Sequence, residues 1–407
     1  GIHLVAVVDL SPARAKESLA RVGWDAARYS ATSLQEAAKS GATFVTDDVE
    51  KMIASEHIDI VIDSTGSPAA GIRHALLCFD HRKHIIMVNV EADVLAGPLL
   101  ARKAAEAGVI YSMASGDQPA LIAELVDWAR TIGLEVVCAG KGTKYLPIYH
   151  QATPDTVWGH YGFSEEQVAG GDFNAQMFNS FLDGTKSALE MAAVSNACDL
   201  NPPSNGLEFP PCGVDDLPHV FRPVSEGGIL TQKGTVEVVS SVERDGRPVF
   251  RDLRWGVYAV FEAPSQYVVD CFAQYGLKTD STGKYAAMYK PYHLIGLELG
   301  ISVASIAVRG EATGATGEWK GDVVATAKRL LKAGEKLDGE GGFTVYGKLM
   351  TAADSLKLGA LPIGLAHNMV LNKDIPAGKP VCWGDVNYDA SLQSIQFRRE
   401  MEKVFQV

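Results

Sequence analysis

The chain has no Cys-x-x-Cys pair, no long uncharged apolar run and no surplus of basic residues. Six scattered cysteines, at positions 78, 138, 198, 212, 271 and 382, exclude a disulfide framework and a spaced zinc site, and they favour a reducing cytoplasm. No apolar stretch reaches the ~20 residues that a membrane helix needs, and no signal peptide is recognisable. The net charge of −12 disfavours nucleic acid as a partner. We therefore expect a cytoplasmic protein that binds a small molecule.

The first third alternates short apolar runs with amphipathic segments. The runs 2–10, 58–64, 84–90, 109–114 and 135–139 predict strands, and the segments around 68–80, 94–107 and 119–132 predict helices. Strands that are apolar throughout and separated by helices are typical of a parallel sheet covered on both faces. The sequence therefore predicts a doubly wound α/β domain over residues 1–139.

A glycine-rich phosphate-binding turn, Gly-x-Gly-x-x-Gly, is absent from this domain. Folds that bind dinucleotides place that turn after the first strand, so we expect it upstream of Gly1, with 2–10 as the second strand. Asp9 ends that strand, where a carboxylate accepts hydrogen bonds from ribose hydroxyls and repels a 2′-phosphate. Asp9 thus favours NAD over NADP, and Arg14 nearby weakens that preference. Capping of the next helix is the alternative role for Asp9.

A second turn of small residues follows the run 58–64. Ser64, Thr65 and Gly66 lie between a strand and a helix, where a bound nucleotide needs close approach to the backbone. Asn89 stands in a similar place after the run 84–90. We predict that these four residues bind the cofactor, with an ordinary strand-to-helix turn as the alternative.

The pattern changes after residue 140. Pro, Gly and Asn become frequent, and the alternating runs 235–242 and 255–261 predict an α+β domain over 140–320, used for catalysis and oligomerisation. A Gly-rich stretch at 310–321 is typical of a linker. Beyond it, 331–337 (LKAGEKL) and 375–381 (IPAGKPV) repeat an Ala-Gly-x-Lys or Ala-Gly-Lys turn. This pair resembles the small β-clip fold called the SAF domain, which we place at 321–407.

Several motifs carry a resemblance to a known group. They are 84–97 (HIIMVNVEADVLAG), 116–119 (GDQP), 139–142 (AGKG), 181–192 (FLDGTKSALEMA), 226–228 (EGG) and 290–294 (KPYHL). The chain resembles homoserine dehydrogenase-like oxidoreductases with a C-terminal SAF domain, including deoxyxylulose phosphate reductoisomerase-like enzymes. The resemblance implies a Rossmann-like cofactor domain and an NADPH cofactor. Gln118 departs from the acidic residue expected in the GDQP segment, which puts the substrate in doubt.

Reduction of a carbonyl needs a proton donor and a group that stabilises developing negative charge. Lys141, flanked by glycines, and Lys144 match the family segment placed for that role. Asp117 lies in a turn that lines ligand crevices in parallel sheets, and it can equally cap the following helix. We predict all three as catalytic residues.

Four further catalytic candidates are Glu91, Glu190, His219 and His293. Glu91 follows a strand end, and Glu190 lies one helical turn from Lys186, with which a simple salt bridge is the alternative. The two histidines, with Glu226 and Tyr292, come from loop-like segments and complete a polar pocket in this interpretation. Asp117, Glu190 and Glu226 also leave a divalent metal open, with no ligand assigned.

The leading interpretation is an NAD(P)-dependent oxidoreductase that transfers hydride to or from a small hydroxy, keto, sugar-like or phosphorylated compound. A reductoisomerase would add a skeletal rearrangement. The alternatives are a non-redox lyase or aldolase on the same fold, and a ligand-binding sensor. We expect a homodimer or a larger homo-oligomer, paired through the second domain's sheet.

Overall fold

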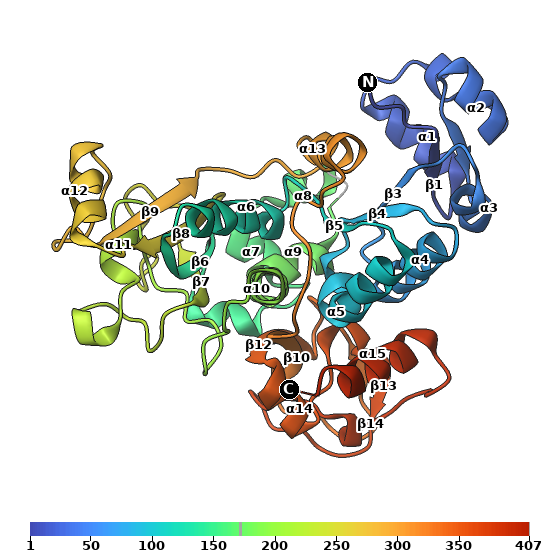
Figure 1. Cartoon of the computed structure of the whole chain (residues 1–407). Helices are drawn as coiled ribbons and strands as arrows, with labels where there is room; N and C mark the ends of the chain where they lie inside the picture. Colours follow the sequence, from blue (N-terminus) through green and yellow to red (C-terminus); the bar gives the residue numbers. More distant parts are fainter. Residues whose placement is uncertain (171–172, 407) are drawn as a thin grey trace.

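The computed structural model describes residues 1–170 and 173–406 and shows a mixed α/β fold. Strands and helices alternate through the first third, as the apolar runs predict (Figure 1). The elements there are β1 (Ala6–Val8), α1 (Pro12–Arg21), η1 (Ala26–Tyr29), α2 (Leu34–Ser40), β2 (Phe44–Thr46), α3 (Val49–Ala54), β3 (Ile60–Asp63), α4 (Pro68–Asp80), β4 (His84–Met87), α5 (Val90–Ala107), β5 (Tyr111–Met113) and α6 (Gln118–Thr131).

All strand pairs of this region are parallel within the described residues. β1 pairs with β2, and β3, β4 and β5 form a second sheet in that order. Helices α4 and α5 pack against one face of the second sheet. The other face is covered by α13 (Leu299–Ala304) and the π-helical turn η4 (Ser305–Arg309), through a cluster that includes Ile86 and Ile306. Thus part of the cover comes from a segment about 200 residues further along the chain, which local sequence patterns do not reveal.

The middle of the chain forms a mixed four-stranded sheet in the order β7-β6-β8-β9. β6 is parallel to β7 and antiparallel to β8, which is antiparallel to β9. These strands are β6 (Glu135–Thr143), β7 (Thr235–Ser240), β8 (Val257–Glu262) and β9 (Tyr285–Lys290). The helices of this region are η2 (Pro147–Gln151), α7 (Val157–Tyr161), α8 (Glu165–Gly170), α9 (Ala175–Leu182), α10 (Thr185–Cys198), α11 (Leu217–Val220), η3 (Val224–Glu226) and α12 (Gln266–Gln274).

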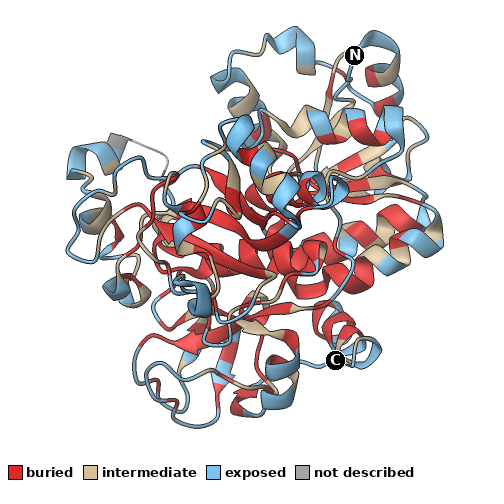
Figure 2. Ribbon diagram, turned by 60° about the vertical axis from the view of Figure 1, so that its left-hand side comes forward, coloured by how far each residue is buried: buried red, intermediate tan, exposed pale blue. Residues whose placement is uncertain are grey.

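Helix α10 lies at the centre of the molecule. It contacts α5 and α6 from the first region, β7 of the middle sheet, and β10 (Gly321–Ala327) and β12 (Val345–Thr351) from the C-terminal region. Twelve of its fourteen residues are buried, among them the charged Glu190. Figure 2 shows the buried residues continuing through the middle of the molecule from one region to the next. Side chains on α10 are therefore placed to meet groups from all three regions.

The C-terminal region is a small antiparallel β structure. It contains β10 (Gly321–Ala327), β11 (Lys336–Asp338), β12 (Val345–Thr351), α14 (Ala352–Leu358), η5 (Ile363–Leu365), β13 (His367–Leu371), η6 (Trp383–Asp385), β14 (Val386–Asn387) and α15 (Gln393–Val404). The two similar phrases of the sequence lie side by side, because Leu331 and Ile375 exchange two backbone hydrogen bonds of 2.9 Å. Helix α15 packs on α4 and α5, so the chain returns to its first region.

Sequence-based element boundaries hold where capping signals are local. The helix predicted over 68–80 is α4, whose Ser67 side chain caps the N-terminus ahead of Pro68. The helix predicted over 94–107 begins earlier, at Val90, because Asn89 caps it. The stretch 310–320 has no helix or strand, yet it packs on the first region: Thr316 donates hydrogen bonds of 2.9 and 3.0 Å to Asp93.

Candidate active site

A polar turn follows β3 at the carboxyl end of the parallel sheet. Asp63 is buried, and it accepts hydrogen bonds from Thr65 and shares a 2.6 Å contact with His74. Burial acts to raise the pKa of Asp63, but these hydrogen bonds outweigh it and lower the pKa, so the carboxylate is charged. Ser64, Thr65 and Gly66 remain exposed, and no atom lies within 4 Å of where a Gly66 Cβ would be. The turn therefore leaves open space at the strand end.

Asn89 fixes this turn from the neighbouring strand end. Its amide nitrogen donates to Asp63 Oδ1, Thr65 Oγ1 and the Ser67 carbonyl at 3.1, 3.1 and 2.8 Å. Its side-chain oxygen accepts from the Ala92 backbone N–H, which caps α5. Because the side chain is fully used, Asn89 acts by holding the turn at the end of β3 in place.

Asp9 lies just beyond β1, in the place predicted from the sequence. Its Oδ1 accepts a hydrogen bond from the Ser11 backbone at 2.8 Å and lies 3.3 Å from Arg14 Nη2. Its side chain remains 31% exposed. Asp9 thus supports the start of α1, and part of its side chain stays accessible to solvent.

Lys141 lies at the centre of the middle sheet and forms a buried ion pair with Glu190 of α10. The flanking glycines have a packing reason. A Cβ at Gly140 would collide with the Glu237 carbonyl oxygen, and one at Gly142 with the Leu253 carbonyl oxygen. β6 therefore passes close to its neighbours on the face that Gly140 and Gly142 occupy, and Lys141, which points to the opposite face, meets α10.

Lys186 pairs with Glu91, 2.5 Å away, and this corrects the sequence-based alternative of a Lys186–Glu190 salt bridge. Lys186 and Glu190 do share a face of α10, but each has a closer partner on another element. Burial acts to lower the pKa of Lys186, yet the charges of Glu91 and other nearby carboxylates outweigh it and raise the pKa. The side chain is a permanent cation at neutral pH.

Asp117 lies beside these two pairs, at the N-cap of α6. It accepts a 2.9 Å hydrogen bond from the Gln118 backbone, so its predicted capping role is confirmed. Burial and the charge of Glu190 raise the pKa of Asp117 to about 7. We use the name "charged cluster" for Lys141, Lys186, Glu91, Asp117 and Glu190, which come from β6, α10, α5 and the start of α6.

Glu340 of the C-terminal region also faces the charged cluster, and no sequence motif indicates this. It belongs to residues 339–342 (Gly-Glu-Gly-Gly), which we call the GEGG loop. Burial and the charge of Glu91 raise the pKa of Glu340 to about 8, while Lys186 opposes the rise. In the sequence, the glycines of this loop are not placed between a strand and a helix, as those of a phosphate-binding motif would be, and no other pattern marks the loop as part of a site.

Other predicted residues lie outside the cluster. Lys144 donates a 2.9 Å hydrogen bond to the His160 carbonyl, and burial lowers its pKa. His293 Nδ1 lies 2.7 Å from the Trp255 carbonyl oxygen. The next residue, Gly256, accepts a hydrogen bond from the Gly142 backbone N–H through its carbonyl. His219 is exposed on the short helix α11.

The polar pocket that included Glu226 is not assembled, and this prediction was wrong in its geometry. Glu226 accepts a hydrogen bond from Tyr285, at one end of β9. Lys290, at the other end of β9, lies opposite Val257 of β8, which in turn lies opposite Lys141 of β6. Five residues of strand, about 17 Å, separate the two ends. Glu190 pairs with Lys141, so Glu226 is also remote from Glu190, and the candidate metal-ligand trio of Asp117, Glu190 and Glu226 is not assembled. In residues 1–170 and 173–406, no three His, Cys, Asp or Glu side chains are grouped to hold a metal ion.

The charged cluster combines two cations with three carboxyl groups, of which Asp117 has a pKa raised to about 7, and Glu340, whose pKa is raised to about 8, faces it. Cations at fixed positions bind an oxygen-rich or anionic substrate and stabilise negative charge on oxygen. Carboxyl groups with a pKa near the working pH exchange protons with a substrate efficiently. Glu91 and Asp117 follow β4 and β5, so the cluster adjoins the edge formed by Asp63, Thr65 and Asn89.

A family model described as "Oxidoreductase DRL, catalytic domain" matches residues 116–299. The matched segment contains Lys141, Lys186, Asp117 and Glu190, four of the five members of the charged cluster. Glu91 and Glu340 lie outside it. The match supports an oxidoreductase. No curated protein matches the chain.

Solved structures with some likeness include a probable dehydrogenase from Thermotoga maritima, with 13% identity, 77% of this chain and 83% of that chain covered, and a TM-score of 0.35. Another is 1-deoxy-D-xylulose 5-phosphate reductoisomerase from Zymomonas mobilis in complex with NADPH, with 13% identity, 76% and 74% covered, and a TM-score of 0.31. Among the residues described, no helix is both long and apolar enough to cross a bilayer.

Proposed function

We propose that this chain is an NAD(P)-dependent oxidoreductase acting on a small hydroxy or keto compound of the sugar-like or phosphorylated class. One observation carries the proposal: the open, polar edge of a parallel sheet adjoins a charged cluster built by the next region. In doubly wound folds, ligands bind in the crevice outside the carboxyl ends of the strands. The family-model match over 116–299 supports the same chemistry.

The residues at the sheet edge fit a pyridine nucleotide. Gly66 has φ +65°, a left-handed conformation that favours glycine, and there is free space around it. Ser64 and Thr65 are exposed beside it and offer hydroxyls and backbone groups. The bound nicotinamide ring supplies or accepts the hydride. Accessible Asp9 favours NAD, and its contact with Arg14 leaves a route to NADP if Arg14 turns toward a 2′-phosphate.

The charged cluster supplies the other half of the reaction in this proposal. Lys186 and Lys141 bind the substrate's oxygen atoms and stabilise an alkoxide as hydride adds to the carbonyl carbon. Glu91 and Glu190 hold the two ammonium groups in place through their ion pairs. A cationic Lys186 suits a phosphate or a vicinal diol.

We further propose a cytoplasmic homodimer or larger homo-oligomer, with an SAF-like C-terminal domain over 321–407. The adjacent phrases around Leu331 and Ile375 support the latter, because paired turns of this kind are expected of a β-clip. Strand β9 is an edge of the middle sheet and is open to pairing with a second copy.

A titration of the full-length protein with NADH and with NADPH, monitored by the fluorescence of the nucleotide, tests the proposed function. We expect saturable binding of at least one nucleotide and its oxidation with a panel of hydroxyketones and their phosphates. Lys186→Met should abolish turnover and leave nucleotide binding intact, because Lys186 faces substrate in this proposal. Lys357→Met, on α14, is the control and should change neither.

Two outcomes would contradict the proposal. If neither nucleotide binds, the proposed NAD(P) cofactor is wrong. If the Lys186 variant and the wild type turn over equally, the proposed role of the charged cluster is wrong. Loss of turnover on addition of a chelator would instead favour a metal-assisted reductoisomerase.

A further inference from the structure

The GEGG loop connects β11 to β12 and extends from the C-terminal region to helix α9. Gln176 of α9 donates two hydrogen bonds to this segment, to the carbonyls of Asp338 and Glu340 at 3.0 and 2.8 Å. Asn179, one turn later, donates to the Gly341 carbonyl at 2.8 Å and to the Ala152 carbonyl at 3.0 Å. The backbone on both sides of the Glu340 side chain is therefore fixed to the middle region.

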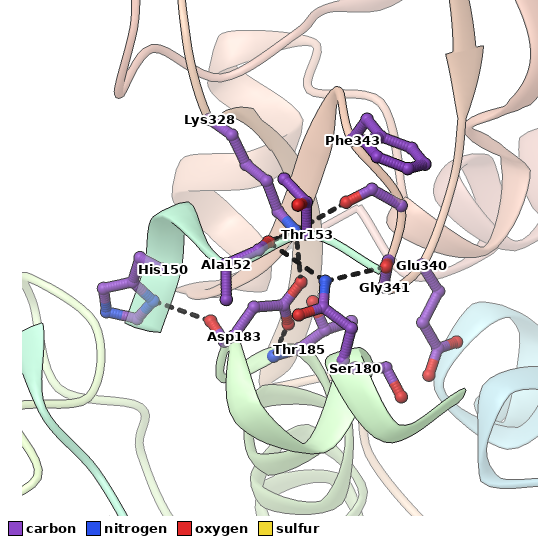
Figure 3. Close-up of polar contacts among 12 residues, drawn as sticks. His150, Ala152, Thr153, Ser180, Asp183, Thr185, Lys328, Glu340, Gly341 and Phe343 are labelled. Atoms are coloured by element: carbon purple, nitrogen blue, oxygen red, sulfur yellow. Dashed lines mark hydrogen bonds and ion pairs between the residues drawn. The ribbon is translucent and has the colours of Figure 1, made fainter. Parts of the chain in front are cut away.

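A buried ion pair secures the far end of the loop (Figure 3). Lys328 Nζ lies 2.8 Å from Asp183 Oδ2 and donates to the Gly342 carbonyl at 2.7 Å. The side chains of Lys328 and Asp183 are 2% and 0% exposed. In Figure 3 the Glu340 side chain points away from this pair, on the side of Ser180.

The glycines of the loop allow this close contact. Gly341 has φ +66°, and a Cβ there would collide with the Gln176 carbonyl oxygen. A Cβ at Gly342 would collide with the Asp338 carboxylate. A larger residue at Gly341 would push the loop away from α9, and one at Gly342 would disturb the Asp338 carboxylate that accepts from the Phe343 and Thr344 backbone, so either change would move Glu340.

The groups that face Glu340 come from every element packed around it. They are Glu91 of α5, Lys186 of α10, Asp183 between α9 and α10, and Ser180 of α9. Within the described part of the chain, no Lys, Arg or His nitrogen lies within 4.0 Å of the Glu340 carboxylate. The loop is thus tightly anchored, yet the one carboxyl it carries is left without an ion-pair partner beside the charged cluster.

We propose that the C-terminal region completes the active site, with Glu340 as the proton donor to the substrate. This inference rests on the proposed function. As hydride passes from the reduced nicotinamide to the carbonyl carbon, the carbonyl oxygen takes the Glu340 proton. The products are an alcohol, a Glu340 carboxylate and the oxidised nucleotide, and water then returns a proton to Glu340. In the reverse direction the carboxylate accepts the proton.

Glu340 suits this step better than the other acids and cations of the site. Lys186 and Lys141 are each held by a carboxylate, and Asp117 is buried at a helix N-cap, where it accepts a backbone hydrogen bond. Glu340 keeps partial exposure and can exchange its proton with water between turnovers. Its burial and the charge of Glu91 favour the protonated form at neutral pH.

Carboxyl-carbon NMR titration of glutamate-labelled protein tests the setting of Glu340 without a substrate. We expect one glutamate with a midpoint near 8, absent in Glu340→Gln and present in the control Glu335→Gln, which changes a half-buried glutamate of the same region that pairs with Arg329. Glu91→Gln should lower the midpoint by removing a repelling charge, and Lys186→Met should raise it. A Glu340 midpoint within one unit of the ordinary glutamate value of about 4.3 would overturn the proposal.

Kinetics test the catalytic role. Glu340→Gln should reduce turnover about 100-fold, the usual size of an acid–base contribution, with the nucleotide Kd unchanged and the high-pH limb of the profile lost. Glu335→Gln should retain wild-type turnover and pH profile. Unchanged turnover in Glu340→Gln would overturn this inference alone, whereas failure of the wild type to bind either nucleotide would overturn the inference and the proposed function together.

Discussion

Replacing Lys328 by Met removes the cation that links three segments at the base of the GEGG loop. Its Nζ pairs with Asp183 and donates to the carbonyls of Ala152 and Gly342, both at 2.7 Å. Because both charged side chains are almost fully buried, the variant leaves Asp183 without compensation inside the protein. Breaking such a pair costs about 3–5 kcal/mol. That cost lowers the folded-to-unfolded ratio by a factor of at least about 100.

The pH dependence of this loss has a definite sign. Burial raises the pKa of Asp183, and Lys328 opposes the rise. Without Lys328 the pKa rises further, so the folded variant retains a proton that the unfolded chain releases. The deficit should therefore be small at acid pH and grow as the pH rises through the raised pKa.

Urea unfolding followed by tryptophan fluorescence measures the effect. Lys332→Met, which breaks an exposed pair with Asp374, is the control and should cost less than about 1 kcal/mol. The double variant Lys328→Met, Asp183→Asn should recover part of the stability, since the uncompensated charge is gone. Equal unfolding midpoints for the Lys328 and Lys332 variants would refute the reasoning.

Further expectations concern stability, the sheet edge and assembly. Burial raises the pKa of Glu237 to about 7, so the folded protein keeps a proton that the unfolded chain releases. Between pH 5 and 7 the free energy of unfolding of the wild type should therefore fall more steeply than that of Glu237→Gln, by up to about 1.4 kcal/mol per pH unit. Urea midpoints of the two proteins that change in parallel with pH would contradict this. A Cβ at Gly71 would lie 2.6 Å from Ala92 Cβ and 2.8 Å from Asn89 Nδ2, so Gly71→Ala should displace the start of α5 together with Asn89 and weaken nucleotide binding about tenfold. Gly159→Ala, where a Cβ meets open space, should leave binding unchanged. Light scattering should give at least twice the 43.5 kDa chain mass, and a monomer would refute the assembly.

Local signals account for the parts of the fold that the sequence predicted. The α4 helix follows from Ser67, Pro68 and an amphipathic run, and each of these acts over a few residues. The parallel pairing of β3, β4 and β5 follows from apolar runs separated by helices. Residue type and position at strand ends sufficed to select Asp117 and Glu91.

Long-range contacts explain what the sequence did not predict. Helical spacing suggested a Lys186–Glu190 pair, but tertiary packing gives each residue a partner from another element, 95 and 49 residues away. Glu340 reaches the charged cluster only through the fold of the C-terminal region around α9. The predicted grouping of Glu226 with Asp117 was wrong because the loops that carry candidate residues lie at different ends of the middle sheet. Glu226 lies at the Tyr285 end of β9, whereas Lys141 is in line with the Lys290 end.

Hydrogen–deuterium exchange, with and without saturating NADH or NADPH, tests most directly whether a pyridine nucleotide binds at the carboxyl edge of the parallel strands. We expect new protection in peptides covering 63–67 and 89–93, with little change in the remote edge strand β9. Unchanged exchange at those two strand ends, or protection confined to other surfaces, would contradict it.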